Sequence, residues 1–170
     1  MLPFDPIAEA HRNWSAAGWA EAADGMAFVT SIMRVQQICM AWIDEVLAPF
    51  GLTFARFEAL RLLAFTRQGR LPLGKIGERL QVHPASVTNV VDRLERDMLV
   101  RRLPHATDGR TTLAAITPKG RRLVATATDA LNTKVFQQTG LSDPQLRDLV
   151  ATLAELRQSA GDFDDPTDDD

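Results

Sequence analysis

The sequence predicts a mainly α-helical fold with a small β-hairpin, and three observations lead to this prediction. Apolar residues recur at intervals of three and four through most of the chain, which is the periodicity of amphipathic helices. Two short apolar and β-branched segments, 99–103 and 111–116, flank a turn region, as the strands of a hairpin do. Pro84 and Pro118 each stand where a first helical residue is expected, a position that favours proline.

Composition excludes several classes of protein. The chain has 170 residues, which suits one domain or one small domain with an attached helical module. Its single cysteine, Cys39, cannot form an internal disulfide. The N-terminus lacks a basic stretch followed by an apolar run, so we expect no secretory signal and a cytoplasmic location. The most apolar segment, 26–47, contains Arg34, Asp44 and Glu45, so we expect no membrane span.

Charge is distributed unevenly along the chain. The formal net charge is −3. Residues 56–122, however, hold 14 basic and 6 acidic side chains, a net of +8, whereas the remainder holds 5 basic and 16 acidic ones, a net of −11. A segment with such an excess of positive charge attracts anions. The central segment is therefore the candidate for contact with a nucleic acid.

The segments before and after this basic region are predicted to be helical. We interpret residues 1–24 as an N-terminal arm, whose short helix is broken by Gly18 and by the glycine that follows Asp24. Residues 25–51 and 118–160 are interpreted as a helical dimerisation region.

Two adjacent apolar stripes along 26–47 make a wider face than one core contact needs, so we expect a second subunit to cover it. A core helix within a monomer is the alternative. An S-x-x-Q capping box at 142–145 opens the last helix, and the aspartate-rich residues 161–170 are expected to form a disordered acidic tail.

The basic region contains, in order, the parts of a winged helix-turn-helix, which we place at residues 52–117. A short helix at 73–80 is followed by a tight connection at 81–83 and a second helix from Pro84. That second helix has an apolar stripe and an opposite polar face. An arginine-flanked hairpin follows it. Each part alone is a weak signal, but their order is specific for DNA binding.

The polar face of the second helix supplies side chains suited to the major groove. That groove is about 12 Å wide and admits one helix, whose short polar side chains can hydrogen-bond base edges. Ser86, Thr88 and Asn89 are the candidates for base readout. Asparagine can pair with adenine through two hydrogen bonds. The alternative interpretation is an ordinary solvated helix face.

Phosphate contacts are expected from the helix N-terminus and from nearby cations. The candidates for DNA backbone contact are His83, Arg93, Arg101 and Arg102. At the hairpin tip, Asp108 can orient Arg110, and an extended arginine suits a narrow minor groove. The alternatives are a surface ion pair at the tip and arginines that merely protect an edge strand.

Several motifs together resemble the MarR family of bacterial transcriptional regulators. They are L-E-x-x-x-L-V-x-R at 94–102, D-x-R at 108–110 and T-P-x-G at 117–120. The resemblance implies a homodimer whose first and last helices interlock, with recognition helices about one turn of double-stranded DNA, roughly 34 Å, apart on a pseudo-palindromic operator. Two positions depart from the family pattern, since Met98 and Gln81 stand where glycine is common.

The resemblance also implies a pocket for a small, often aromatic, anionic effector between the dimerisation helices and the DNA-binding lobe. The candidates for its lining are Met33, Gln37, Trp42, Phe57 and Arg61, although ordinary core packing is the alternative for each. The effector would relieve repression.

Other chemistries are less well supported by the sequence. Cys39 lies in an apolar stripe and the chain has no tyrosine, which argues against the peroxide sensing of some relatives. No histidine pair has helical metal-ligand spacing, so we expect no metal and no cofactor. An enzyme is disfavoured by the absence of a glycine-rich phosphate loop. A winged-helix module that binds only proteins is the remaining alternative.

Overall fold

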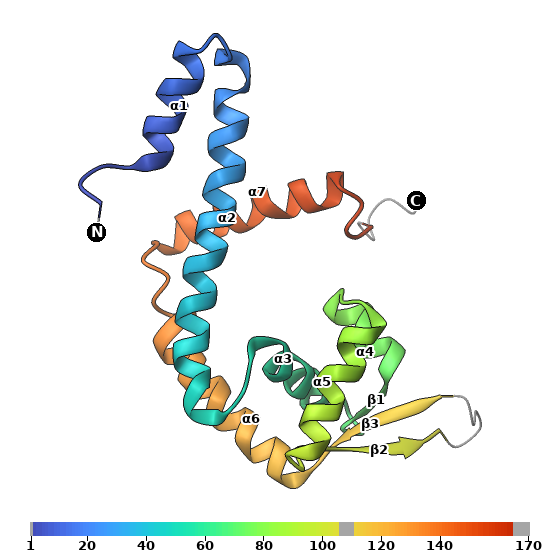
Figure 1. The fold of residues 1–170 in the computed structure, drawn as a ribbon. Coiled ribbons are helices and arrows are strands. Elements are labelled where there is room, and N and C mark those ends of the chain that lie inside the picture. The colour runs from blue at the N-terminus through green and yellow to red at the C-terminus, as the bar shows by residue number, and fades with distance from the viewer. Residues whose placement is uncertain (1, 106–110, 165–170) are drawn as a thin grey trace.

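The structure, a computed structural model, describes residues 2–105 and 111–164. It is mainly helical with one small antiparallel sheet, which confirms the predicted fold class (Figure 1). The predicted wing-tip residues Asp108 and Arg110, and positions 165–170 of the predicted acidic tail, lie outside the described residues.

The N-terminal part is a helical hairpin. Helix α1 (Pro6–Ala16) packs along the first half of the long α2 (Ala20–Leu47). His11 and Asp24 join the two helices at 2.8 Å between Nε2 and Oδ1. The prediction that the glycine after Asp24 breaks a helix is wrong, because α2 begins at Ala20. A glycine inside a helix costs only about 1 kcal/mol, which packing against α1 can offset.

The lobe predicted to be a winged helix-turn-helix follows after a short 3-10 turn, η1 (Ala48–Phe50). Its elements are α3 (Phe54–Phe65), β1 (Arg70–Pro72), α4 (Leu73–Leu80), α5 (Pro84–Arg96), β2 (Val100–Pro104) and β3 (Thr112–Ile116). The strands form an antiparallel sheet in the order β1-β3-β2. Strand β1 was not predicted, since three residues are too few to show alternation.

The C-terminal part returns to α2. Helix α6 (Pro118–Leu131) continues into a π-helical turn, η2 (Asn132–Phe136), and α7 (Asp143–Ser159) follows. The predicted capping box is present, because Gln145 Oε1 accepts from the Ser142 backbone N–H at 3.0 Å. Thr117 caps α6 by accepting from the Gly120 N–H at 3.0 Å.

One apolar core joins α3, α5, the sheet, α6 and the last turn of α2. Its fully buried side chains include Leu47, Leu60, Leu63, Leu94 and Leu131. The rest of α2 and all of α7 contribute little to it, since α2 buries only Ala23, Ile43 and Leu47 and α7 buries no residue. The core-helix alternative for α2 is therefore wrong for the chain on its own, and Cys39 is only half-buried.

Candidate nucleic-acid interface

Helix α5 has one buried face and one exposed face. Val87, Val91 and Leu94 lie in the core, where α5 packs against α3 and α4. On the opposite side, the predicted contact residues are all exposed: Ser86, Thr88, Asn89 and Arg93. Burial of the apolar stripe thus fixes which side chains of α5 face outward, as the sequence predicted.

The candidate base-reading side chains remain available for a ligand. Within the described ranges, Ser86 and Asn89 make no side-chain hydrogen bond. Thr88 Oγ1 donates to the Pro84 carbonyl oxygen at 3.2 Å, one turn back in the helix. A hydroxyl that donates in this way still has lone pairs to accept a second hydrogen bond.

His83 is the N-cap of α5. Its Nδ1 accepts from the Ala85 N–H at 3.2 Å, which satisfies one of the unpaired donors of the first turn. A neutral ring that accepts through Nδ1 carries its proton on Nε2. The imidazole can therefore still donate one hydrogen bond to a phosphate.

The two arginines of β2 have different surroundings. Arg101 is exposed and makes no hydrogen bond or ion pair to the described parts of the chain. Arg102 instead forms ion pairs with two acidic side chains of α5, at 2.7 Å to Asp92 Oδ1 and 2.7 Å to Glu95 Oε2. The Glu95 carboxylate also accepts from the Arg102 backbone N–H at 2.8 Å.

These bonds change both ionisation equilibria. The Arg102 backbone N–H, followed by its guanidinium, lowers the pKa of Glu95. Desolvation is the largest single influence on Arg102 and lowers its pKa, but the hydrogen bonds to Glu95 and Asp92 together raise it. Arg102 therefore ties the wing to the recognition helix, a role that the sequence analysis missed. A basic residue in a strand seven positions after a glutamate gave no signal of it.

Two further contacts fix the C-terminal end of α5. The Arg56 guanidinium of α3 pairs with Asp97 and also donates to the Gly51 carbonyl oxygen at 2.9 Å. Lys119 Nζ donates to the Asp97 carbonyl oxygen at 2.9 Å. The next residue, Met98, has a φ of 60°, a left-handed conformation that favours glycine. Met98 therefore adopts the backbone conformation that glycine would adopt, and it does so with strain.

Comparison with known proteins agrees with this architecture. The family model described as the MarR family matches residues 52–112. A solved structure of Sco5413, a MarR family transcriptional regulator from Streptomyces coelicolor, is 51% identical, with a TM-score of 0.76, and the match covers 84% of this chain and 99% of that one. This chain belongs to the MarR family.

Two other matches are more distant. The HTH-type transcriptional regulator YhbI of Bacillus subtilis is 28% identical over 120 residues, which is 68% of this chain and 77% of that protein. The structure of Sco3205 from Streptomyces coelicolor in complex with DNA shares the fold at a TM-score of 0.71, with 20% identity over 81% of this chain and 88% of that one. The MarR-family chain is thus a DNA-binding transcriptional regulator and not an enzyme.

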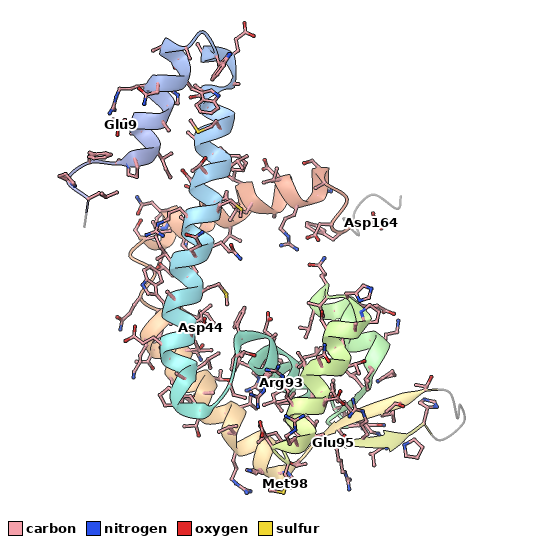
Figure 2. The ribbon with its side chains drawn as sticks, in the orientation of Figure 1. Glu9, Asp44, Arg93, Glu95, Met98 and Asp164 are labelled. Carbon is pink, nitrogen blue, oxygen red and sulfur yellow. The ribbon has the colours of Figure 1, made fainter. Side chains whose placement is uncertain are left out.

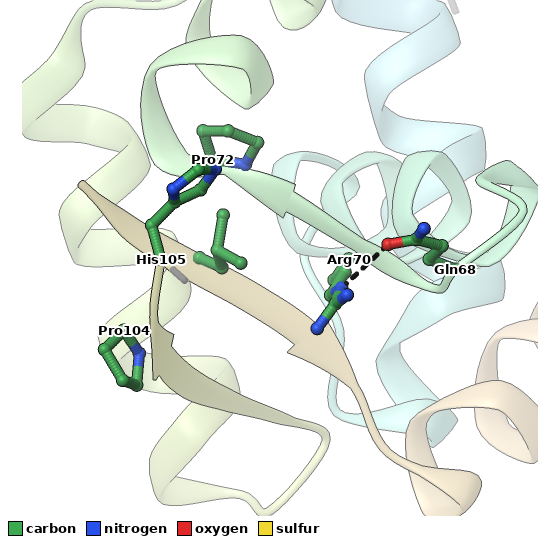
Figure 3. A pocket seen from close by; sticks show the side chains of 6 residues that line it. Gln68, Arg70, Pro72, Pro104 and His105 are labelled. Carbon is green, nitrogen blue, oxygen red and sulfur yellow. Dashed lines mark hydrogen bonds between the residues drawn. The ribbon is translucent and has the colours of Figure 1, made fainter. Parts of the chain in front are cut away.

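A hollow lies beside the ends of β2 and β3 that are nearest the tip of the MarR wing. A pocket of about 230 Å³ lies between β1 and the β2–β3 hairpin, and its lining includes Arg70, Pro72 and His105 (Figure 3). Arg70 Nε donates to Gln68 Oε1 at 3.0 Å across one side of it.

The residues predicted to line a MarR effector pocket do not share one environment. Phe57 is buried in the core, whereas Met33, Gln37 and Trp42 are exposed along α2. Arg61 lies between α3 and α6, where its guanidinium stacks on Phe65 at 4.1 Å and donates to Thr128 Oγ1 at 3.4 Å. None of these five residues lines the hollow beside β1.

Proposed function

We propose that this protein is a homodimeric, sequence-specific repressor that binds a pseudo-palindromic operator in the cytoplasm. The observation that carries the proposal is the outer face of α5, where Ser86, Thr88 and Asn89 are exposed beside free arginines. Direct readout of the major groove requires such a face on a helix held rigidly from behind. The buried apolar stripe and the Arg102 ion pairs supply that support.

The contacts divide into two groups. Ser86, Thr88 and Asn89 read bases, whereas Arg93, Arg101 and the His83 ring contact phosphates. Arg110, with Asp108 as its proposed partner, is assigned to the minor groove from the sequence alone. Arg102 is reassigned in this proposal: with two acidic partners already in place, it positions the wing and does not contact the DNA backbone.

A second subunit explains the exposed apolar surface. In the described chain, α2 exposes five apolar side chains along one stretch, Phe28, Val29, Ile32, Met33 and Val35. Helix α7 exposes Leu149, Val150 and Leu156. A contiguous apolar surface on a soluble regulator marks a site of protein contact. Two-fold symmetry then places two copies of α5 on the two half-sites of a palindrome.

A membrane is the alternative partner for this surface. The segment Ala20–Phe50 is long and apolar enough to cross a bilayer by length and composition alone. Its last turn, however, lies in the core of the DNA-binding lobe, with Leu47 fully buried. Arg34, Asp44 and Glu45 also lie within it. These observations favour the second subunit.

A small anionic effector relieves the repression. Arg61 is the most suitable anchor for an anion among the five candidates, because its Nε is buried without a hydrogen-bond partner in the described part of the chain. A small aromatic anion bound there would move α3 relative to α6 and so change the spacing of the two lobes.

The deciding experiment is to map the DNA protected upstream of the protein's own gene and then to compare variants on that operator. Asn89→Ala should alter base preference at one position in each half-site, whereas Arg110→Ala should weaken binding to all duplexes. Asn13→Ala, on the exposed side of α1, is the matched control. Wild-type affinity should fall steeply with salt, with a log–log slope of about −0.9 for each phosphate contacted.

Two results would contradict the proposal. Salt-insensitive binding without sequence preference would favour a protein-interaction module. Retention of full operator affinity and unchanged preference by both variants would show that α5 and the wing are not the DNA contacts.

A further inference from the structure

The C-terminal segment contacts the turn of the helix-turn-helix. Gln81, the residue after α4, donates through its Nε2 to Asp162 Oδ1 at 2.6 Å and to the Asp162 carbonyl oxygen at 3.2 Å. The other carboxylate oxygen of Asp162 accepts from Arg157 Nε at 2.6 Å. The Arg157 guanidinium also lies 5.1 Å from the centre of the Phe163 ring.

The conformation of Gln81 is strained. Its φ is 53°, in the left-handed region that is unfavourable for a residue other than glycine. Glycine would adopt this turn without strain, but it would have no side chain to reach Asp162. Strained residues persist where the surroundings or a function require them. Here the side chain supplies the hydrogen bonds that join the lobe to the C-terminal segment.

Helix α7 has little else within its own chain to hold its far end. It buries no residue, and Figure 1 shows it extending from α6 across to the side of the molecule where α4 lies. The side chain of Asp162, by contrast, is only 29% exposed. The contact with Gln81 therefore closes a ring that runs through α2, α6, α7 and the lobe.

The contact places negative charge beside the DNA-binding surface. Gln81 lines a groove of about 560 Å³ together with Pro84 and Thr88 of the recognition helix. It precedes the N-cap His83 by two positions. Asp164 follows at the end of the described chain, and Figure 2 labels it beyond α7. Carboxylates near the N-terminus of α5 repel the phosphates that would approach there.

We propose that Gln81 and Asp162 form an autoinhibitory latch that holds the acidic C-terminal segment beside the recognition helix and lowers the affinity for DNA. The latch rests on the DNA binding proposed above. It acts most on non-specific DNA, because a specific operator adds base contacts that compensate for the repulsion.

Binding to a mixed-sequence duplex tests the latch. Gln81→Ala and Asp162→Ala should each raise affinity about two- to fivefold, the range of one exposed charge interaction. The double variant should gain no more than the larger single one, because residues that act as one unit are not additive. Asp148→Ala is the matched control. It also removes one negative charge from the C-terminal part of the chain, but the Asp148 carboxylate has no partner in the described ranges.

A second measurement needs no DNA. Hydrogen exchange at residues 161–163 should accelerate in Gln81→Ala. The Asp162 N–H donates to the Arg157 carbonyl oxygen at 3.0 Å, and loss of the contact with Gln81 should make this hydrogen bond open more often. Unchanged exchange would overturn the contact itself. Affinity equal to wild type in Gln81→Ala, or an equal gain in Asp148→Ala, would overturn the autoinhibition. If the wild type binds no duplex, the proposed function fails, and hydrogen exchange still decides whether the latch exists.

Discussion

Gly120 lies so close to neighbouring backbone that a side chain does not fit there. A Cβ built there would overlap the carbonyl oxygen of Leu99 and lie 3.0 Å from Ile116 Cγ1. The same Leu99 carbonyl oxygen accepts from the Thr117 hydroxyl at 3.1 Å. The T-P-x-G motif therefore serves the close packing of α6 against the strand, where a methyl group does not fit.

Gly120→Ala should destabilise the fold by about 2 kcal/mol or more, because overpacking against backbone cannot relax by a rotamer change. Thermal or denaturant unfolding measures the loss. Gly25→Ala is the control: it is also helical, and its added Cβ meets no atom within 4 Å. That control should gain about 0.5–1 kcal/mol. Equal stability of the two variants would contradict the packing explanation.

Met98 occupies a position whose backbone conformation glycine would adopt without strain. Its side chain is 66% exposed and its backbone is left-handed, so the side chain contributes strain and little packing. Met98→Gly should stabilise the protein by about 0.5–1 kcal/mol, since relief of the strain exceeds the added entropy of the unfolded chain. Met98→Ala keeps the strain and should show no gain. Denaturant midpoints of the two variants decide between these outcomes.

At the scale of elements, the join between α5 and the wing depends on ionisation. Figure 2 labels Glu95 near the C-terminal end of α5, where β2 begins. The folded state lowers the Glu95 pKa below its ordinary value of 4.5, because the carboxylate accepts two hydrogen bonds from Arg102. The folded protein thus holds this proton less tightly than the unfolded chain does.

The pH dependence follows from that sign. The stabilisation is fully present above pH 4.5 and is lost as pH falls through the lower pKa of the folded state. Glu95→Gln should remove this part of the acid dependence and should lower stability at neutral pH. Unfolding of both proteins between neutral pH and pH 3, roughly the region where carboxylates titrate, provides the measurement. If the stability of both proteins depended on pH in the same way, Glu95 would not contribute to the acid dependence.

At the scale of the whole molecule, the exposed faces of α2 and α7 decide the assembly. In the single chain, Val29 is 57% exposed and Val150 is 58% exposed. The proposed dimer would cover both side chains. Each apolar side chain of this size contributes about 1.5–3 kcal/mol when it is fully buried. In a symmetric dimer, every residue of the interface contributes twice.

Val29→Glu should therefore weaken the proposed dimer by at least about tenfold, since a difference of 1.4 kcal/mol is a factor of ten. Light scattering after size-exclusion chromatography measures the mass as the protein is diluted. Gln36→Glu, an exposed polar position on the same helix, is the control and should leave the dimer unchanged. A wild-type monomer at all concentrations would contradict the proposal, and sedimentation with lipid vesicles would support the membrane alternative.

Local signals in the sequence predicted much of the lobe. Thr53, Pro84 and Thr117 each mark a helix start that the structure confirms, and the apolar stripe of α5 is buried. Boundaries governed by longer-range packing were predicted less well. Helix α2 continues through Gly25 because α1 lies against it, and β1 exists because β3 supplies its hydrogen bonds.

Local patterns in the sequence identify the family, the order of the helices and of the β2–β3 hairpin, and the outward face of α5, because these depend on periodicity and on residues close together in the chain. The packing of β2 against α5 determines that Arg102, and not Arg101, pairs with Asp92 and Glu95 in the described part of the chain. The tertiary structure also decided that Gln81 reaches Asp162, across a separation of 81 residues. Contacts between distant segments depend on how the helices pack, and no local pattern records that arrangement.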